Sequence, residues 1–155
     1  LGSLAATGSN AKMSEYHAAI GLISLSKWEL AAQNRRTLEA DLIENLNTAS
    51  NGRLRWQTPA GSASLMAPTT LCTRLPDAAR RDALEAACAR ARIMTRRWYQ
   101  PLLSQMQALP GETVHLPAPC AEDLAQTLLG LPFFAGMTQG QRERVRAVVG
   151  VVLQS

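Results

Sequence analysis

The residue types best suited to chemistry in this chain are arginines and aromatics rather than metal ligands. Fourteen of the sixteen basic residues are arginines, and only Lys12 and Lys27 are lysines. The planar fork of an arginine donates two parallel hydrogen bonds to one phosphate or carboxylate. Arg96, Arg97 and Tyr99 place two guanidinium groups and an aromatic ring close together. This group predicts an anion-binding site or, in the simpler alternative, an exposed arginine pair at the edge of a strand.

The cysteines and histidines do not form a metal site by their spacing. Cys72, Cys88 and Cys120 are far apart, no C-x-x-C occurs, and neither His17 nor His115 clusters with them. The pattern argues against structural zinc and against a disulfide framework. We expect no metal, and a reducing, cytoplasmic setting is the default for such a sequence.

Length and composition exclude several other classes of protein. A chain of 155 residues is one domain or part of one. With 46% hydrophobic and 18% charged residues, it is not a disordered tail. No apolar run approaches the roughly 18 residues of a membrane span, and the first residues do not resemble a signal peptide. The missing initiator Met suggests a piece of something longer, and we expect no membrane partner.

Two helices are strongly marked by capping residues and apolar spacing. Apolar residues at intervals of mostly three and four predict one long first helix, from Ser14 to the Asn51-Gly52 turn. Thr138 and Gln141 form the capping-box pair of a last helix. The apolar face of that helix consists of four valines, Val145, Val148, Val149 and Val152.

Between these helices the sequence predicts a small sheet and further helices. Extended runs are predicted over 53–57, 64–72, 93–95 and 131–134. Asp77 is expected to cap a helix, and residues 121–129 are expected to form another, with Leu124 and Leu128 pointing inward. The pair Arg80-Arg81 is expected on a solvated helix face. The fold class is therefore α/β, an α+β small domain with a mostly antiparallel sheet packed with helices.

Three segments of the sequence resemble those of a known enzyme family. They are GSNAKMSEYHAAIGL at 8–22, IMTRRWYQP at 93–101 and GLPFFAGMT at 130–138. They are similar, in the same order, to segments of the DegT/DnrJ/EryC1/StrS aminotransferases. These are pyridoxal-phosphate (PLP) enzymes that aminate keto sugars attached to nucleotides. The resemblance covers nearly the whole chain, from about residue 8 to residue 153.

The resemblance implies the C-terminal lobe of a fold-type I PLP transferase. Residues 1–13 would be a loop carrying the G-x-N segment, and 14–155 the C-terminal small domain. In the family, the lysine that forms the Schiff base with PLP lies upstream of the G-x-N segment. Neither Lys12 nor Lys27 matches that position, so no catalytic residue is expected in this chain. Full-length members would be cytoplasmic homodimers that use glutamate and a nucleotide sugar in polysaccharide biosynthesis.

The resemblance also implies site residues. Asn10 matches the asparagine that reaches across the dimer to the PLP phosphate of the partner subunit, and otherwise it is a plain loop residue. Lys12, Arg97 and Tyr99 match positions near the sugar nucleotide, where an arginine holds a diphosphate and an aromatic ring covers a sugar or base. A solvated lysine near a helix start remains the alternative for Lys12. Relatives often have a histidine where this chain has Ser104.

Two other functions compete with an aminotransferase fragment. The first is a non-catalytic dimerisation module derived from this family, which would associate through the long first helix. The second is nucleic-acid binding, prompted by a sequence pI of about 9.4. Aromatic residues make up only 5%, and the charges do not gather into one run, so we expect no nucleic-acid partner.

Overall fold

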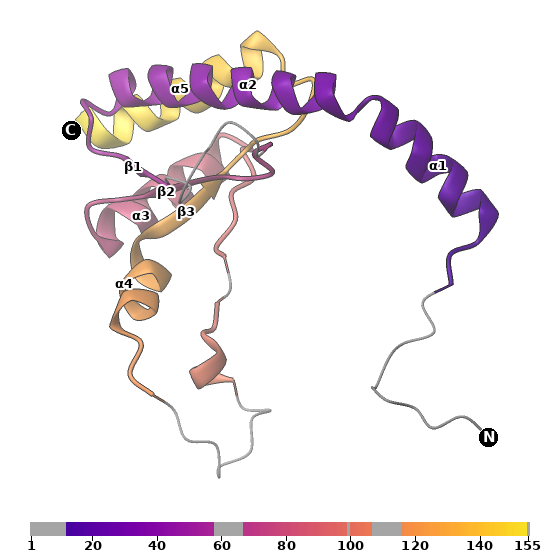
Figure 1. Ribbon diagram of the computed structural model, residues 1–155. Helices are drawn as coiled ribbons and strands as arrows, with labels where there is room; N and C mark the ends of the chain where they lie inside the picture. Colours follow the sequence, from indigo (N-terminus) through magenta and orange to yellow (C-terminus); the bar gives the residue numbers. More distant parts are fainter. Residues whose placement is uncertain (1–11, 58–66, 99, 107–115, 155) are drawn as a thin grey trace.

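The computed structural model describes residues 12–57, 67–98, 100–106 and 116–154 (Figure 1). The elements in these ranges are, in chain order, the helices α1 (Glu15–Ser26) and α2 (Trp28–Ala49), the strands β1 (Arg55–Trp56) and β2 (Leu71–Arg74), the helix α3 (Ala78–Arg90), the 3-10 turn η2 (Leu103–Gln105), the helix α4 (Pro119–Thr127), the strand β3 (Leu128–Leu131) and the helix α5 (Gln139–Gln154).

The three strands form one antiparallel sheet. The order is β1-β2-β3, so the central strand comes second in the sequence. Leu71 pairs with Leu131 and Cys72 with Gly130, which joins strands more than fifty residues apart in the sequence. The predicted α/β domain with a small antiparallel sheet is therefore confirmed.

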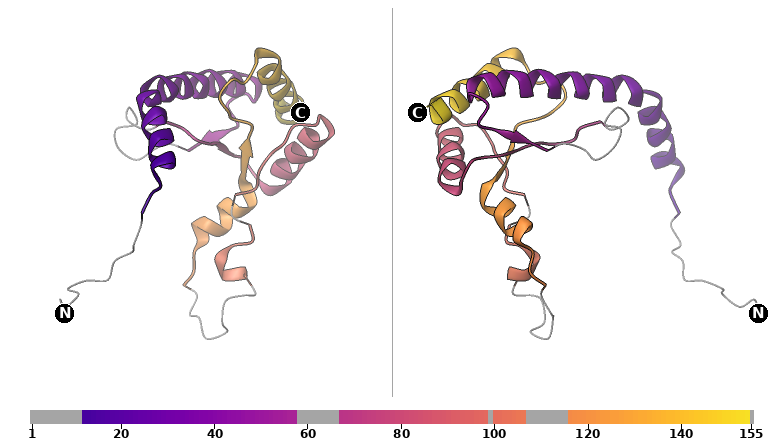
Figure 2. Two further views of the ribbon diagram at one scale, coloured as in Figure 1. Left: turned by 90° about the vertical axis from the view of Figure 1, so that its right-hand side faces the viewer. Right: turned by 60° about the vertical axis from the view of Figure 1, so that its left-hand side comes forward.

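Helices cover the sheet and enclose one hydrophobic core. α2 and α5 lie side by side, and α3 lies on the other side of α5 (Figures 1 and 2). The fully buried large apolar side chains of the core come from α2, α3, β3, α5 and the residue that follows β2: Leu42, Leu46, Leu75, Leu84, Leu129, Val149 and Leu153. This layer fixes the positions of α3 and β3, which carry the candidate site.

The prediction of one long first helix is wrong, because the helix breaks at Lys27. The N–H of Lys27 donates to the carbonyls of Leu25 and Ser24, which tightens the last turn of α1. Two serine side chains compete for neighbouring carbonyls: Ser24 donates to Ile20 at 2.9 Å, and Ser26 donates to Ile23 at 2.8 Å. Serine back-bonding of this kind bends helices. The chain consequently changes direction between α1 and α2 (Figure 2).

The predicted caps of α3 and α5 are confirmed. The Asp77 carboxylate accepts from the Arg80 backbone N–H at 2.7 Å. At the start of α5, the Thr138 N–H donates to Gln141 Oε1 at 2.8 Å, and the Gln141 N–H donates to the Thr138 hydroxyl at 3.3 Å. Each bond satisfies a backbone donor that the first helical turn leaves unpaired.

Four of the intermediate predictions are wrong in whole or in part. Among its described residues, the run expected over 64–72 is a strand only at its end, as β2 (Leu71–Arg74), and the run expected over 131–134 contributes only Leu131 to β3. Residues 93–95 form no strand, because this segment pairs with β3 only at the next residue, Arg96. The helix expected over 121–129 begins at Pro119 and ends at Thr127, since Leu128 already pairs with Arg74 in the sheet. Leu124 is 40% exposed rather than inward. Sheet pairing over β3 overrides the helical spacing of the leucines.

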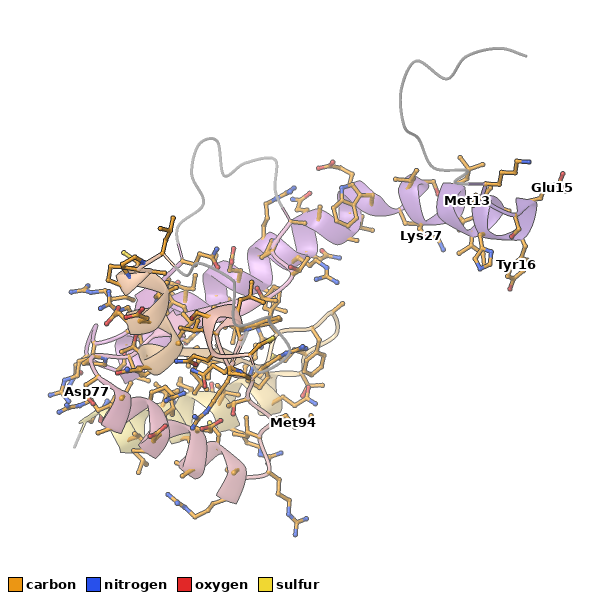
Figure 3. The ribbon with its side chains drawn as sticks, turned by 90° about the horizontal axis from the view of Figure 1, so that it is seen from below. Met13, Glu15, Tyr16, Lys27, Asp77 and Met94 are labelled. Atoms are coloured by element: carbon orange, nitrogen blue, oxygen red, sulfur yellow. The ribbon has the colours of Figure 1, made fainter. Side chains whose placement is uncertain are left out.

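α1 extends away from the rest of the molecule. None of its twelve residues, all within the described part of the chain, is buried. Met13 and Tyr16, labelled in Figure 3, lie at its outer end, and Tyr16 is 73% exposed. The other exposed apolar residues in and just after α1 include Ile20, Leu22, Ile23, Leu25 and Trp28. No helix in the described ranges is long and apolar enough to cross a bilayer.

Candidate functional site

The arginine pair lies in the segment that leaves α3 and passes along β3. The Arg96 N–H donates to the Gly130 carbonyl at 2.9 Å, and the Gly130 N–H donates back to the Arg96 carbonyl at 2.8 Å. This reciprocal pair is a single antiparallel bridge. It holds the backbone of Arg96 at the open edge of β3, while β2 covers the other edge.

Arg96 stacks on the ring that follows two residues later. Its guanidinium carbon lies 4.5 Å from the centroid of the Trp98 ring. A cation over an indole face is attracted by the ring quadrupole, with a free energy of roughly 0.5–1 kcal/mol at an exposed site. The stack orients Arg96, whose guanidinium forms no hydrogen bond or ion pair with other described residues.

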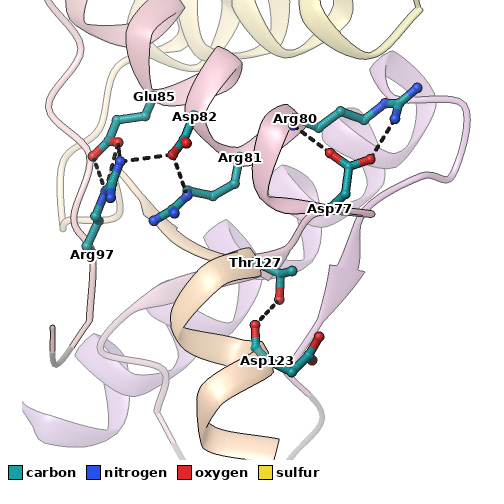
Figure 4. Close-up of polar contacts among 8 residues, drawn as sticks. All are labelled: Asp77, Arg80, Arg81, Asp82, Glu85, Arg97, Asp123 and Thr127. Carbon is teal, nitrogen blue, oxygen red and sulfur yellow. Dashed lines mark hydrogen bonds and ion pairs between the residues drawn. The ribbon is translucent and has the colours of Figure 1, made fainter. Parts of the chain in front are cut away.

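Arg97 points the other way, to two carboxylates on α3 (Figure 4). Its Nε donates to Glu85 Oε2 at 2.8 Å, and its Nη2 lies 3.0 Å from Asp82 Oδ1 and also contacts Glu85 Oε2. The hydrogen bonds from Arg97 lower the pKa of Glu85, and those to Glu85 raise the pKa of Arg97. Both Nε and Nη2 of Arg97 therefore bond to carboxylates of α3, and these bonds hold the segment with the arginine pair against that helix.

A cavity of about 850 Å³ lies beside this segment. Arg96, Arg97 and Trp98 line one part of it, and the remaining lining is mostly apolar. Leu102, Leu103, Met106 and Leu116 belong to that apolar lining, and Ser104 also lies in the wall. An apolar pocket with a few polar groups is the usual form of a small-molecule site.

The structure brings together only part of the predicted site. Arg97 lies in the wall of the cavity. Lys12 is exposed and comes just before Met13, which lies at the outer end of α1 and away from the sheet (Figure 3). Asn10 and Tyr99 lie outside the described residues. Within one subunit, Lys12 and Arg97 are therefore not neighbours.

Several contributors were missed from the sequence. Asp82 and Glu85 are three residues apart on α3, so their carboxylates lie on the same face of the helix. Two acidic residues at this spacing could have predicted that a basic side chain binds there. Arg81 was expected in solvent, yet it is only 5% exposed, and its Nε lies 2.9 Å from Asp82 Oδ1. The expectation that Arg80 is exposed is confirmed, and its guanidinium pairs with Asp77.

The residues that the structure describes do not form a PLP site by themselves. A lysine that holds PLP as an imine must be sheltered beside a cavity, with its pKa lowered by burial or a neighbouring cation. Lys12 and Lys27, the lysines of the chain, are both exposed and line none of the cavities described. No cluster of three or more potential metal ligands occurs among the described residues.

Solved structures of aminotransferases share this fold. TlmJ from Streptoalloteichus hindustanus superposes with a TM-score of 0.76 at 22% identity, over 98% of this chain and 40% of its own. A DegT DnrJ EryC1 StrS aminotransferase from Brucella abortus gives 0.71 at 21%, over 96% and 38%. Spr1654 from Streptococcus pneumoniae, described as a sugar aminotransferase and solved in its PMP form, gives 0.73 at 17%, over 92% and 35%. A search of curated proteins finds no match.

The fold is therefore that of part of a PLP-dependent aminotransferase. The chain spans about 40% of the solved structures that it matches. A family model matches residues 2–150, and the chain belongs to the DegT/DnrJ/EryC1/StrS aminotransferase family.

Proposed function

We propose that this chain is the C-terminal small domain of a PLP-dependent aminotransferase acting on a nucleotide-linked keto sugar, with glutamate as amino donor. Residues 1–13 would be the loop with the G-x-N segment, and 14–155 the domain. One observation carries the proposal: the family match covers residues 2–150, while TlmJ is matched over only 40% of its length. The proposed setting is cytoplasmic polysaccharide biosynthesis.

The proposal divides the catalytic site between this domain and the rest of a longer enzyme. The exposed positions of Lys12 and Lys27 support an imine lysine that lies elsewhere. Asn10 would donate its amide to the PLP phosphate of a partner subunit. In support, α1 has twelve residues, a length of roughly 18 Å. A helix of that length places Met13, which comes just before it, away from the sheet of its own chain (Figure 3), as a contact with another subunit would require.

The nucleotide sugar would occupy the 850 Å³ cavity beside the arginine pair. Arg97 and Tyr99 would contact it from this segment, and Lys12 would contact it from another subunit. Because Nε and Nη2 of Arg97 bond to carboxylates of α3, its Nη1 would donate to the ligand. Arg96 would join them, because its guanidinium is oriented by Trp98 and keeps its donors for a diphosphate.

The division of the site predicts that the chain alone is inactive. The experiment incubates the purified 155-residue chain with PLP, glutamate and a keto sugar nucleotide, beside a full-length family member as positive control. We expect amination by the control and none by this chain above the rate of free PLP. Measurable turnover by the 155-residue chain would refute the proposal.

A second candidate is a non-catalytic dimerisation module, and the exposure of α1 favours it. Large apolar residues occur all around this helix, and a helix that is apolar all round is normally covered. Sedimentation velocity of the chain tests the module, with Ile20→Glu/Ile23→Glu as a variant that charges one face of α1. A dimer abolished by the variant supports it, and a strict monomer at high concentration contradicts it.

A further inference from the structure

A second cavity lies apart from the arginine pair. It has a volume of about 420 Å³ and is enclosed by the turn after α3, the segment after β3 and the first turns of α5. Ile93, Met137 and Val145 are buried and form its floor. Met94 and Phe134 stand at its sides, and Met94 is 89% exposed (Figure 3). The cavity shares no lining residue with the site proposed for the nucleotide sugar.

The polar lining of this cavity is basic. Arg92 and Arg144 line it, and no carboxylate does so among the described residues. Arg144 Nη2 donates to the Ala91 carbonyl, which fixes its guanidinium beside the turn. Gln141 also lines the cavity; its Oε1 accepts from Thr138, so its NH₂ group is the end left to donate. The first turn of α5 adds partial positive charge.

Arg92 occupies a backbone conformation that favours glycine. Its φ is 56°, in the left-handed region. The turn is a Schellman motif: the Ile93 N–H donates to the Cys88 carbonyl at 2.8 Å, and the Arg92 N–H donates to the Ala89 carbonyl at 3.0 Å. A side chain at this position raises the energy of the turn. An arginine here stabilises the turn less than glycine would, yet it brings a cation to the cavity.

We propose that this cleft binds a small anion with an aromatic or branched apolar body. The acid group would lie between Arg92 and Arg144, and the body would lie on Met94, Phe134 and Met137. A volume of 420 Å³ is within the range of small-molecule sites. The basic lining favours an acid over a neutral ligand, because only a carboxylate forms charge-assisted hydrogen bonds with the two guanidinium groups. The inference does not depend on the proposed aminotransferase function.

The probe is 2-naphthoate, with 2-naphthamide as an uncharged ligand of the same shape. Both are titrated into the chain labelled at its methionine methyl groups. Met94 and Met137 report on the cleft, Met106 reports on the 850 Å³ cavity, and Met13 lines neither and serves as the internal control. We expect saturable shifts and ligand contacts at Met94 and Met137, and an affinity for naphthamide at least about tenfold weaker.

Two variants separate charge from folding. Arg92→Gly relieves the left-handed backbone, so its thermal midpoint should be unchanged or higher, while naphthoate affinity should fall at least about fivefold. Arg144→Gln removes the second cation. The matched control is Asn51→Gly, which relieves the left-handed turn after α2 (φ 51°) without touching the cleft. It should leave the affinity unchanged.

Three results would each overturn the proposal. The first is equal binding of naphthoate and naphthamide, which would show that charge has no part. The second is unchanged affinity in both Arg92→Gly and Arg144→Gln. The third is shifts confined to Met13 or Met106, which would place the ligand on other apolar surfaces of the chain.

Discussion

Gly130 lies so close to Trp98 that a Cβ built on it would come within 2.5 Å of the indole Nε1. The same Cβ would lie 3.1 Å from the Arg96 carbonyl oxygen, which is fixed by its bond to the Gly130 N–H. The bridge between these segments and the stack of Arg96 on Trp98 therefore require glycine at position 130 in β3.

The first prediction is that Gly130→Ala destabilises the domain by about 1–3 kcal/mol, the usual cost of overpacking. Urea unfolding measures the change, and the intrinsic fluorescence of Trp98 should change with it. Gly150→Ala in α5 is the matched control. The nearest atom to its Cβ is the Ala49 carbonyl oxygen at 3.6 Å, an ordinary contact. It should stabilise the chain by up to about 1 kcal/mol, and equal effects of the two variants would contradict this account.

The second prediction concerns the ion pair between Glu85 and Arg97. The pKa of Glu85 is lowered in the folded state, chiefly by hydrogen bonds from Arg97. A lowered pKa means that the stabilisation is present above the unfolded pKa and is lost as the pH falls through the folded one. The free energy of unfolding should therefore decline below about pH 4.5.

Glu85→Gln tests the assignment. It should cost about 0.5–1 kcal/mol at pH 7, because the pair is partly exposed, and it should flatten the acid dependence. Glu143→Gln is the control, since it removes an exposed pair with Arg146 within one turn of α5. An acid dependence that is identical in wild type and Glu85→Gln would show that other carboxylates cause the decline.

Local sequence signals predicted the helix starts well. The caps at Asp77 and at Thr138 with Gln141 involve side chains that bond backbone groups within four residues. Such bonds depend on little beyond the residues themselves. The helix break at Lys27 has an equally local cause, the side-chain hydrogen bonds of Ser24 and Ser26. The spacing of apolar residues does not reveal this break.

The candidate site depends on contacts between residues that are distant in the sequence, and residue spacing does not predict such contacts. Asp82 and Glu85 meet Arg97 because α3, a turn and the bridge at Gly130 bring them together across twelve or more residues. β3 was assigned partly to a helix because its pairing with β2 is invisible in a window of ten residues. Residue types alone predicted that the arginine pair binds an anion, the family resemblance implied that this anion is a sugar nucleotide, and the ligand contacts stay predictions.

The third prediction concerns thiol reactivity. Cys72 and Cys88 are buried, whereas Cys120 is exposed. Burial, with a smaller contribution from Glu85, raises the pKa of Cys88 to about 11. At pH 8 only about one thiol in a thousand would be thiolate at that site. A disulfide reagent should titrate one thiol rapidly in the native chain and three in denaturant, and Cys120→Ser should abolish the fast phase. A fast phase that survives in Cys120→Ser would contradict the burial of the other two.

The last prediction follows from the proposed nucleotide-sugar site. If the 850 Å³ cavity holds a diphosphate, then UDP or dTDP should perturb the NMR signals of Arg96 and Trp98 in the 155-residue chain, while uridine or thymidine should not. Arg96→Ala should weaken the binding at least about tenfold, since it removes a charge-assisted contact. Arg90→Ala, an exposed arginine outside the cavity, should leave it unchanged.

Arg97 should behave differently from Arg96 in that titration. Arg97→Lys keeps the charge but loses the fork that joins Asp82 and Glu85, so it should lower the unfolding free energy as well as nucleotide affinity. Arg96→Ala should change affinity with little loss of stability, because its side chain makes only the stack on Trp98 among the described contacts. If the two variants lowered stability alone, the arginine pair would be structural, and the nucleotide would have to bind elsewhere.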